Sequence, residues 1–145
     1  MYGIDFERIE EQLAYLRTCL NVLDDVIPLE SEPAQFAAAR ALHVAIECVT
    51  DIGNALIDGF FMRDPGSYED IVEILKDENV LPEEEGEQIK RLVECRRKLV
   101  VQYTDVDKKE LERLTTLADA LKPFSRRIGE YLKQELGENV PPFDI

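Results

Sequence analysis

Apolar residues recur at intervals of three and four through five segments of this chain, a spacing that places them along one side of an α-helix. Prolines and glycines separate the segments, and no stretch of comparable length alternates apolar and polar residues as a strand would. We therefore expect an all-α fold, an antiparallel bundle of about five helices with short connections. The expected helices span residues 5–26, 34–61, 68–76, 82–103 and 108–136.

The length of 145 residues fits a single domain over residues 1–145, with an ordered core over 5–136 and a tail over 137–145. The first residues lack the basic region and apolar run of a secretory signal, and no apolar run approaches the length of a membrane span. We expect a cytoplasmic protein that contacts no membrane. Three cysteines, too far apart in sequence to form a C-x-x-C pair, are expected to be reduced core thiols: Cys19, Cys48 and Cys95.

The chain is strongly acidic, with 31 acidic and 17 basic side chains and a net charge of −14. Such a surface repels phosphate, which argues against general nucleic-acid binding and against DNA as a partner. One segment is locally basic, with Lys90, Arg91, Arg96, Arg97 and Lys98. It is able to hold an anion such as an RNA phosphate. The alternative is that these side chains form a solvated helix face and pair with Glu87 and Glu94.

Arg96 is the most informative of these basic residues. It shares an ideal helix face with Tyr103 and lies beside apolar positions, so it is expected to be partly buried. A partly buried arginine needs acidic or anionic company, and Glu47 and Asp51 lie on a polar stripe of the second predicted helix. The alternative is a purely structural ion-pair network between two packed helices.

The segment RRKLVVQYTDVD, residues 96–107, resembles the signature of the HepT-like family in the HEPN superfamily. That signature reads approximately Arg-Asn-x-Leu-Val-His-x-Tyr, followed shortly by Val-Asp. The stretches HVAIECVTDIGNALI (43–57) and DPGSYEDIVEIL (64–75) resemble the family's second and third helices, so the likeness extends over about residues 38–132. Six residues fall on signature positions: Arg96, Leu99, Val100, Tyr103, Val106 and Asp107.

The resemblance implies a five-helix fold, a homodimer and a toxin-type, metal-independent endoribonuclease with its site at the dimer interface. It places Arg96 at the family's active-site arginine, and in the resulting hypothesis Arg96 binds the scissile phosphate while Glu47 and Asp51 orient it. It also implies that Tyr103 accepts nucleotidyl groups from a partner, an MntA-like nucleotidyltransferase antitoxin. The other RNA-binding candidates are the neighbouring basic residues Arg91, Arg97 and Lys98.

Two positions depart from the signature: Arg97 stands in place of Asn, and Val101 in place of His. Metal-independent RNA cleavage needs proton transfers that His performs near neutral pH and that Val cannot perform. The only histidine, His43, is a candidate substitute, although a lone helical histidine is more often structural. With Glu47 and Asp51 it has a spacing that a metal ligand set also uses, but no cysteine or second histidine completes such a set. We expect no metal and no cofactor.

Three interpretations therefore remain open. One is a HepT-like ribonuclease, weakened or inactive because of Val101. Another is a non-catalytic, dimeric HEPN-type module that binds RNA or protein. A third possibility is a structural bundle in which Arg96 pairs internally. Positions 96 and 101 lie about 140° apart on an ideal helix, so a site that uses both needs two chains or a distorted helix end.

Overall fold

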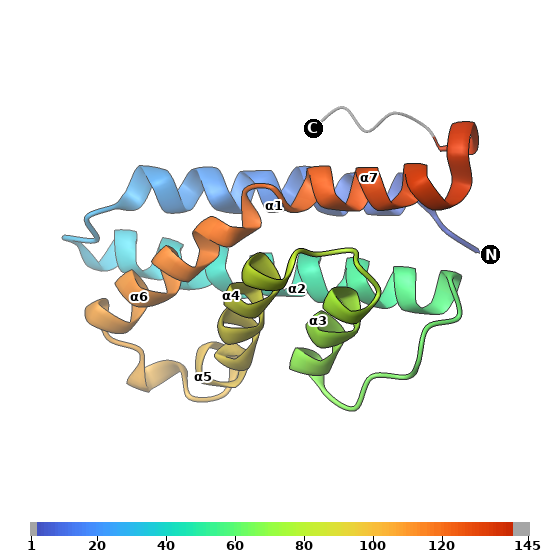
Figure 1. Ribbon diagram of the computed structural model, residues 1–145. Coiled ribbons are helices and arrows are strands. Elements are labelled where there is room, and N and C mark those ends of the chain that lie inside the picture. The colour runs from blue at the N-terminus through green and yellow to red at the C-terminus, as the bar shows by residue number, and fades with distance from the viewer. Residues whose placement is uncertain (1–2, 141–145) are drawn as a thin grey trace.

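The computed structural model describes residues 3–140, and every regular element in that range is helical, which confirms the all-α prediction. The two longest helices, α1 (Phe6–Val26) and α2 (Glu32–Gly59), lie against each other along their length. Two shorter helices, α3 (Tyr68–Asp77) and α4 (Glu83–Glu94), pack against each other, and α3 also packs on α2 (Figure 1). The chain continues through α5 (Arg96–Val100) to α6 (Lys108–Ala118), and α7 (Phe124–Leu136) then runs beside α1 (Figure 1).

One apolar core lies between these helices and takes residues from all of them. The stripes at three- and four-residue spacing supply its fully buried side chains, and each such side chain stabilises the fold by roughly 1.5–3 kcal/mol of transfer free energy. The packing of the short helices onto α2 therefore follows from the same periodicity that predicts the helices. Among these buried residues are Leu13, Leu16, Leu42, Ile46, Leu92, Leu114, Phe124 and Ile128.

The predicted helix over 82–103 is wrong as a continuous helix, because the structure breaks it at Cys95. The Cys95 thiol donates to the carbonyl of Arg91 at 3.5 Å, while the Cys95 N–H turns to the carbonyl of Leu92 at 3.0 Å. In a regular α-helix the Cys95 N–H would donate to the Arg91 carbonyl. Here the Cys95 thiol occupies that carbonyl, and the N–H forms the shorter bond of a 3₁₀ turn. The helix after the break, α5, ends at Val100, so Tyr103 does not continue the helix that carries Arg96.

The predicted helix over 108–136 is likewise two helices. Pro123 has no N–H to donate, and its ring disfavours a continuous helix through this point. Helix α6 therefore ends at Ala118, a 3₁₀ turn covers Asp119–Leu121, and α7 begins at Phe124. The helix is interrupted completely at this point, which lets α7 turn back along α1.

The C-terminal end of α7 is Leu136, and Gly137 follows with a φ of 64°, a conformation that suits glycine. Gly137–Asn139 forms a further 3₁₀ turn. Most of the predicted tail, residues 141–145, lies outside the described residues. Over the described range, none of the helices combines the length and apolar character needed to cross a membrane.

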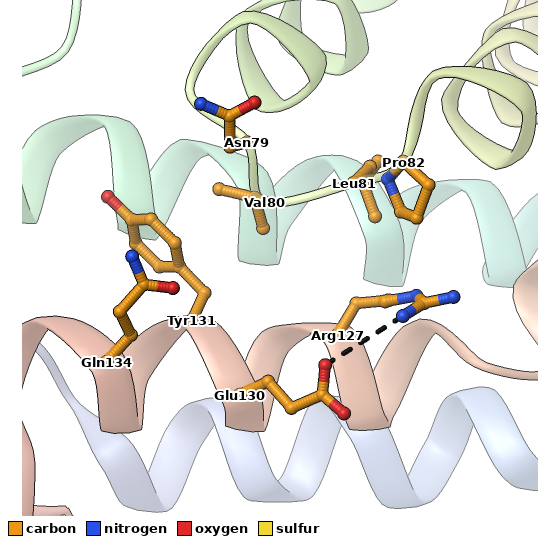
Figure 2. A pocket seen from close by; sticks show the side chains of 8 residues that line it. All are labelled: Asn79, Val80, Leu81, Pro82, Arg127, Glu130, Tyr131 and Gln134. Atoms are coloured by element: carbon orange, nitrogen blue, oxygen red, sulfur yellow. Dashed lines mark ion pairs between the residues drawn. The ribbon is translucent and has the colours of Figure 1, made fainter.

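The connection between α3 and α4 packs on α7 and leaves a small hollow of about 200 Å³ (Figure 2). Its cation, Arg127, is already bound by Glu85 at 2.6 and 2.9 Å and lies 3.8 Å from Glu130. Burial raises the pKa of Tyr131 to about 12, so this phenol stays neutral. The hollow offers no free charge for a ligand. Its lining is Asn79, Val80, Leu81, Pro82, Arg127, Glu130, Tyr131 and Gln134.

Candidate anion-binding site

The side chain of Arg96 crosses from α5 to α2 and is held there by Glu47. Its Nε donates to Glu47 Oε1 at 2.7 Å, and about a quarter of the side chain stays exposed. The break at Cys95 starts a new helix at Arg96, which faces the polar stripe of α2. A charge-assisted bond of this length fixes the orientation of the guanidinium.

Tyr68, the first residue of α3, covers one face of the same guanidinium. The Cζ atom of Arg96 lies 4.0 Å from the centre of the Tyr68 ring, a cation–π contact. Sequence reasoning did not identify Tyr68, because no periodic spacing relates it to Arg96. The available signal was its place at the start of the DPGSYEDIVEIL stretch, directly after the N-cap residue Ser67.

The terminal nitrogens of Arg96 remain available. A guanidinium carries five N–H donors, and Glu47 takes one of them through Nε. Neither terminal nitrogen donates a hydrogen bond to any described residue. Two parallel donors on a planar, immobilised group are suited to bind two oxygens of one phosphate.

Glu47 also links Arg96 to the histidine. His43 Nε2 lies 3.4 Å from Glu47 Oε1, the same oxygen that accepts from Arg96. Asp51, one turn further along α2, forms no direct contact with Arg96 among the described residues. Burial and the neighbouring Glu47 raise the pKa of Asp51, while Arg8 and Arg96 oppose that shift. The structure thus joins His43, Glu47 and Arg96 and leaves Asp51 beside them.

Two further signature positions, 101 and 103, follow the end of α5. Val101, at the position of the family's histidine, is 54% exposed, and Tyr103 is 70% exposed. The Tyr103 hydroxyl forms no hydrogen bond within residues 3–140. The N–H groups of Val101 and Gln102 both donate to the carbonyl of Arg97, which ends the helix here. A distorted helix end, one of the two arrangements that would allow positions 96 and 101 to serve one site, is therefore present.

The basic cluster divides into paired and unpaired members. Lys90 binds Glu73 at 3.2 Å, and Lys98 lies 3.8 Å from Glu110. Arg91 and Arg97 form no ion pair in the part of the chain that the structure describes. The structure therefore leaves two exposed cations near Arg96 along the sequence.

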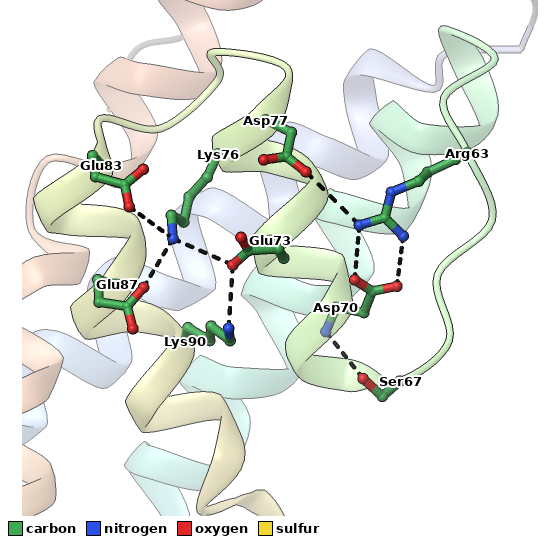
Figure 3. Close-up of polar contacts among 9 residues, drawn as sticks. All are labelled: Arg63, Ser67, Asp70, Glu73, Lys76, Asp77, Glu83, Glu87 and Lys90. Atoms are coloured by element: carbon green, nitrogen blue, oxygen red, sulfur yellow. Dashed lines mark hydrogen bonds and ion pairs between the residues drawn. The ribbon is translucent and has the colours of Figure 1, made fainter.

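The start of α3, and with it Tyr68, is fixed by a bidentate ion pair (Figure 3). Arg63 donates to both carboxylate oxygens of Asp70 at 2.7 and 2.9 Å, and the Gly66 N–H donates to Asp70 at 2.9 Å. The Ser67 hydroxyl accepts from the Asp70 N–H at 3.1 Å and caps the helix. These contacts position the Tyr68 ring before any ligand arrives.

A lysine holds α3 to α4. Lys76 is only 5% exposed, and its Nζ lies 2.8 Å from Glu87 and 3.2 Å from both Glu73 and Glu83 (Figure 3). Because Glu73 also binds Lys90, four charged side chains join the two helices around Lys76. This network fixes the helix that carries Tyr68 against the helix that leads to Arg96.

The cysteines and the acidic groups offer little further chemistry. Cys19 and Cys48 are buried, and burial raises the pKa of the Cys48 thiol to about 12. Cys95 is not a core residue as expected, because it is half-buried at the helix break and accepts a hydrogen bond from Arg113 at 3.4 Å. Among residues 3–140, no cluster of three or more His, Cys, Asp or Glu side chains is arranged to hold a metal.

Comparison with known proteins identifies the family of this chain. The sequence model of the ribonuclease HepT-like family matches residues 9–128. YutE of Bacillus subtilis (strain 168), a provisionally assigned RNase, is 45% identical over 138 residues, which cover 94% of this chain and 96% of YutE. The solved structure of YutE, described as a cytosolic protein of unknown function, superposes with a TM-score of 0.88 over the same shares of the two chains.

Two more distant structures share the fold. The tri-AMPylated HEPN toxin of Shewanella oneidensis, solved in complex with its MNT antitoxin, has a TM-score of 0.75 at 18% identity, over 90% of this chain and 99% of that one. A toxin–antitoxin structure with AMP-PNP has a TM-score of 0.68 at 18% identity, over 89% and 98% of the two chains. The family match and the close relative confirm the resemblance seen in the sequence, and this chain belongs to the ribonuclease HepT-like family.

Proposed function

We propose that this protein is a toxin-type endoribonuclease that works without a metal and with weakened activity, and that Arg96 binds the scissile phosphate. The observation that carries the proposal is the immobilised guanidinium. Glu47 and Tyr68 hold it, and neither terminal nitrogen donates a hydrogen bond within residues 3–140. Donors fixed before the reaction stabilise the charge that develops on the phosphoryl oxygens without reorganising.

In this proposal His43 is the general base, and no side chain acts as the general acid. Cleavage begins when the RNA 2′-hydroxyl attacks phosphorus and loses its proton, and it ends when the 5′-oxygen leaves and gains one. His43 accepts the first proton, and Glu47, at 3.4 Å, stabilises the imidazolium that forms. Solvent protonates the leaving oxygen. A general acid is worth roughly 10²–10⁴ in rate, so its loss at Val101 accounts for weakened activity.

The second candidate is a non-catalytic, dimeric module that binds RNA or protein. The exposed valine at position 101 favours it, because that side chain neither donates nor accepts a proton. In this interpretation Arg96 holds a phosphate. Arg91 and Arg97, which form no ion pair within residues 3–140, extend the contact along the RNA strand together with Lys98. Both candidates share the phosphate site and differ in whether the bond breaks.

The deciding experiment is cleavage of a labelled, mixed-sequence RNA in EDTA. We expect slow cleavage by the natural protein, a loss of roughly 10²–10³-fold in Arg96→Ala, a comparable loss in His43→Gln, and a gain in Val101→His. No cleavage by the natural protein, with activity gained in Val101→His, supports the binding module. Undiminished cleavage in Arg96→Ala rules out Arg96 as the phosphate-binding group.

Regulation through Tyr103 extends the same proposal. Its hydroxyl is exposed and accepts no hydrogen bond from residues 3–140, so an MntA-like nucleotidyltransferase has access to it. The AMPylated Shewanella oneidensis toxin with its MNT antitoxin, which shares this fold, supports such a partner. An added nucleotide brings bulk and negative charge to the turn after α5 and opposes phosphate entry. Mass spectrometry after incubation with ATP and such an enzyme should find an adduct that Tyr103→Phe lacks.

We further propose a cytoplasmic location, supported by the description of the related YutE as cytosolic. The net charge of −14 supports a protein that binds neither DNA nor membrane and contacts RNA only locally.

A further inference from the structure

We propose that Tyr68 and Arg96 together form a nucleotide subsite, in which Arg96 binds the phosphate and the exposed part of the Tyr68 ring stacks on the base of the adjoining nucleotide. The inference rests on the proposed function and adds a ligand class to it: unpaired bases of single-stranded RNA. It begins from the position of the ring, 4.0 Å from Arg96 Cζ and 42% exposed.

The exposure of Tyr68 is not a consequence of helix mobility. The Arg63–Asp70 pair, the Gly66 N–H and the Ser67 cap fix the first turn of α3, and Tyr68 is the first residue of that turn. A large ring is therefore held partly in water at a defined orientation. Such a ring loses little conformational entropy when a flat ligand stacks on it.

The adjacent charge selects the ligand. A phosphate on the terminal nitrogens of Arg96 is separated from its own base by one sugar, and the aromatic ring adjoins the guanidinium. Proteins that bind single strands combine these two elements, a cation for the backbone and an aromatic face for the base. A base inside a duplex is already stacked and does not present its face, so the subsite requires an unpaired nucleotide.

The overall charge of the chain gives stacking particular value. Glu47 and Asp51 lie beside Arg96, and the protein carries −14. Each further phosphate contact works against that charge, whereas an uncharged ring adds affinity that salt does not screen. On this acidic surface, one phosphate contact with one stacked base therefore gives more affinity for RNA than further phosphate contacts would.

The test compares two probes in fluorescence anisotropy. One is a short, labelled, single-stranded 2′-O-methyl oligoribonucleotide, which attack by the 2′-oxygen cannot cleave. The other has the same backbone without bases. We expect the natural protein to prefer the probe with bases by roughly tenfold. Tyr68→Phe should keep this ratio, Tyr68→Leu should bring it close to one, and Arg96→Ala should weaken binding of both probes.

The outcomes separate this subsite from the proposed function. Equal binding of both probes by the natural protein, lost in Arg96→Ala, overturns the stacking subsite and leaves the phosphate site standing. No binding of either probe overturns both proposals. A ratio that survives in Tyr68→Leu places the stacking elsewhere. Equal weakening of both probes in Tyr68→Leu shows that the ring only positions Arg96, and a thermal melt of that variant excludes misfolding as the cause.

Discussion

At the scale of single residues, Gly86 and Lys76 depend on each other. A Cβ atom at Gly86 would overlap Cγ of Lys76 and lie 2.7 Å from its Cδ. The stem of Lys76 cannot move aside easily, because its Nζ is held by Glu73, Glu83 and Glu87. Lysine is rarely buried without such partners. The absence of a side chain at Gly86 therefore lets α3 and α4 pack closely against each other around the buried Lys76 and its glutamate partners.

This dependence predicts that Gly86→Ala changes the free energy of unfolding in opposite directions with and without Lys76. Gly86→Ala should lower the free energy of unfolding by about 1–3 kcal/mol, as overpacking does. In a Lys76→Ala background the space is free, and the same change should raise it by up to about 1 kcal/mol through helix propensity. Urea denaturation of the four proteins completes the double-mutant cycle. The same sign in both backgrounds contradicts the steric explanation.

At the scale of elements, α3 connects the fold to the site. It carries Tyr68 at its start and Lys76 near its end, so its first turn faces Arg96 and its last turn is tied to α4. The bond from Arg63, aided by the Gly66 N–H, holds the pKa of Asp70 at about 2, below its usual 3.8. Hydrogen bonds from Lys90 and Lys76 also lower the pKa of Glu73 on this helix, so α3 carries two acid-sensitive carboxylates, and Asp70 is the one next to Tyr68.

The pH dependence of this element follows from linkage. A carboxylate whose pKa is lower in the folded state binds fewer protons there, so its stabilisation is complete above its unfolded pKa near 4 and is lost as the pH falls through about 2. The loss of unfolding free energy caused by Asp70→Asn should therefore be constant above pH ~5 and shrink toward pH ~2. Urea denaturation across this range measures it. In an Arg63→Gln background the shrinkage should largely disappear, and its persistence would assign the low pKa to another group.

The sequence predicts helices better than it predicts their breaks. Periodicity marks the helical segments because burial of one stripe depends only on local spacing. The break at Cys95 depends on a thiol that competes for a carbonyl and on Arg113, which belongs to another helix. Neither contact leaves a periodic trace, so a continuous helix was the natural expectation.

The candidate site was predictable to a similar extent. Charge and burial indicate that Arg96 needs an acid, and the polar stripe supplies Glu47, which the structure places at 2.7 Å. Which of the two stripe carboxylates makes the contact depends on the turn at Cys95. The position of the Tyr68 ring over Arg96 depends on how the α3–α4 pair packs on α2. Contacts set by the packing of elements distant in sequence are the part that one sequence does not specify.

At the scale of the whole molecule, the net charge of −14 acts on each kind of association differently. RNA binding releases counterions and weakens as salt rises. Self-association brings two equally acidic surfaces together and strengthens as salt screens them, since the Debye length falls from roughly 30 Å at 0.01 M to 8 Å at 0.15 M. The two processes therefore respond to salt with opposite signs, which allows them to be separated in solution.

We propose that the protein is a homodimer whose interface includes Val101 on the turn after α5 and leaves the Tyr103 hydroxyl accessible, because Val101 is an exposed apolar side chain next to the candidate site in sequence. Light scattering at micromolar concentration is measured at about 0.01 M and about 0.15 M salt. It should give the mass of two chains, with dissociation favoured at the lower salt concentration. Val101→Glu adds a charge to this turn and should shift the equilibrium to monomer. Gln134→Glu adds the same charge on α7 and should not. A monomer at both salt concentrations, or equal effects of the two substitutions, would rule out this interface and leave a site built from one chain.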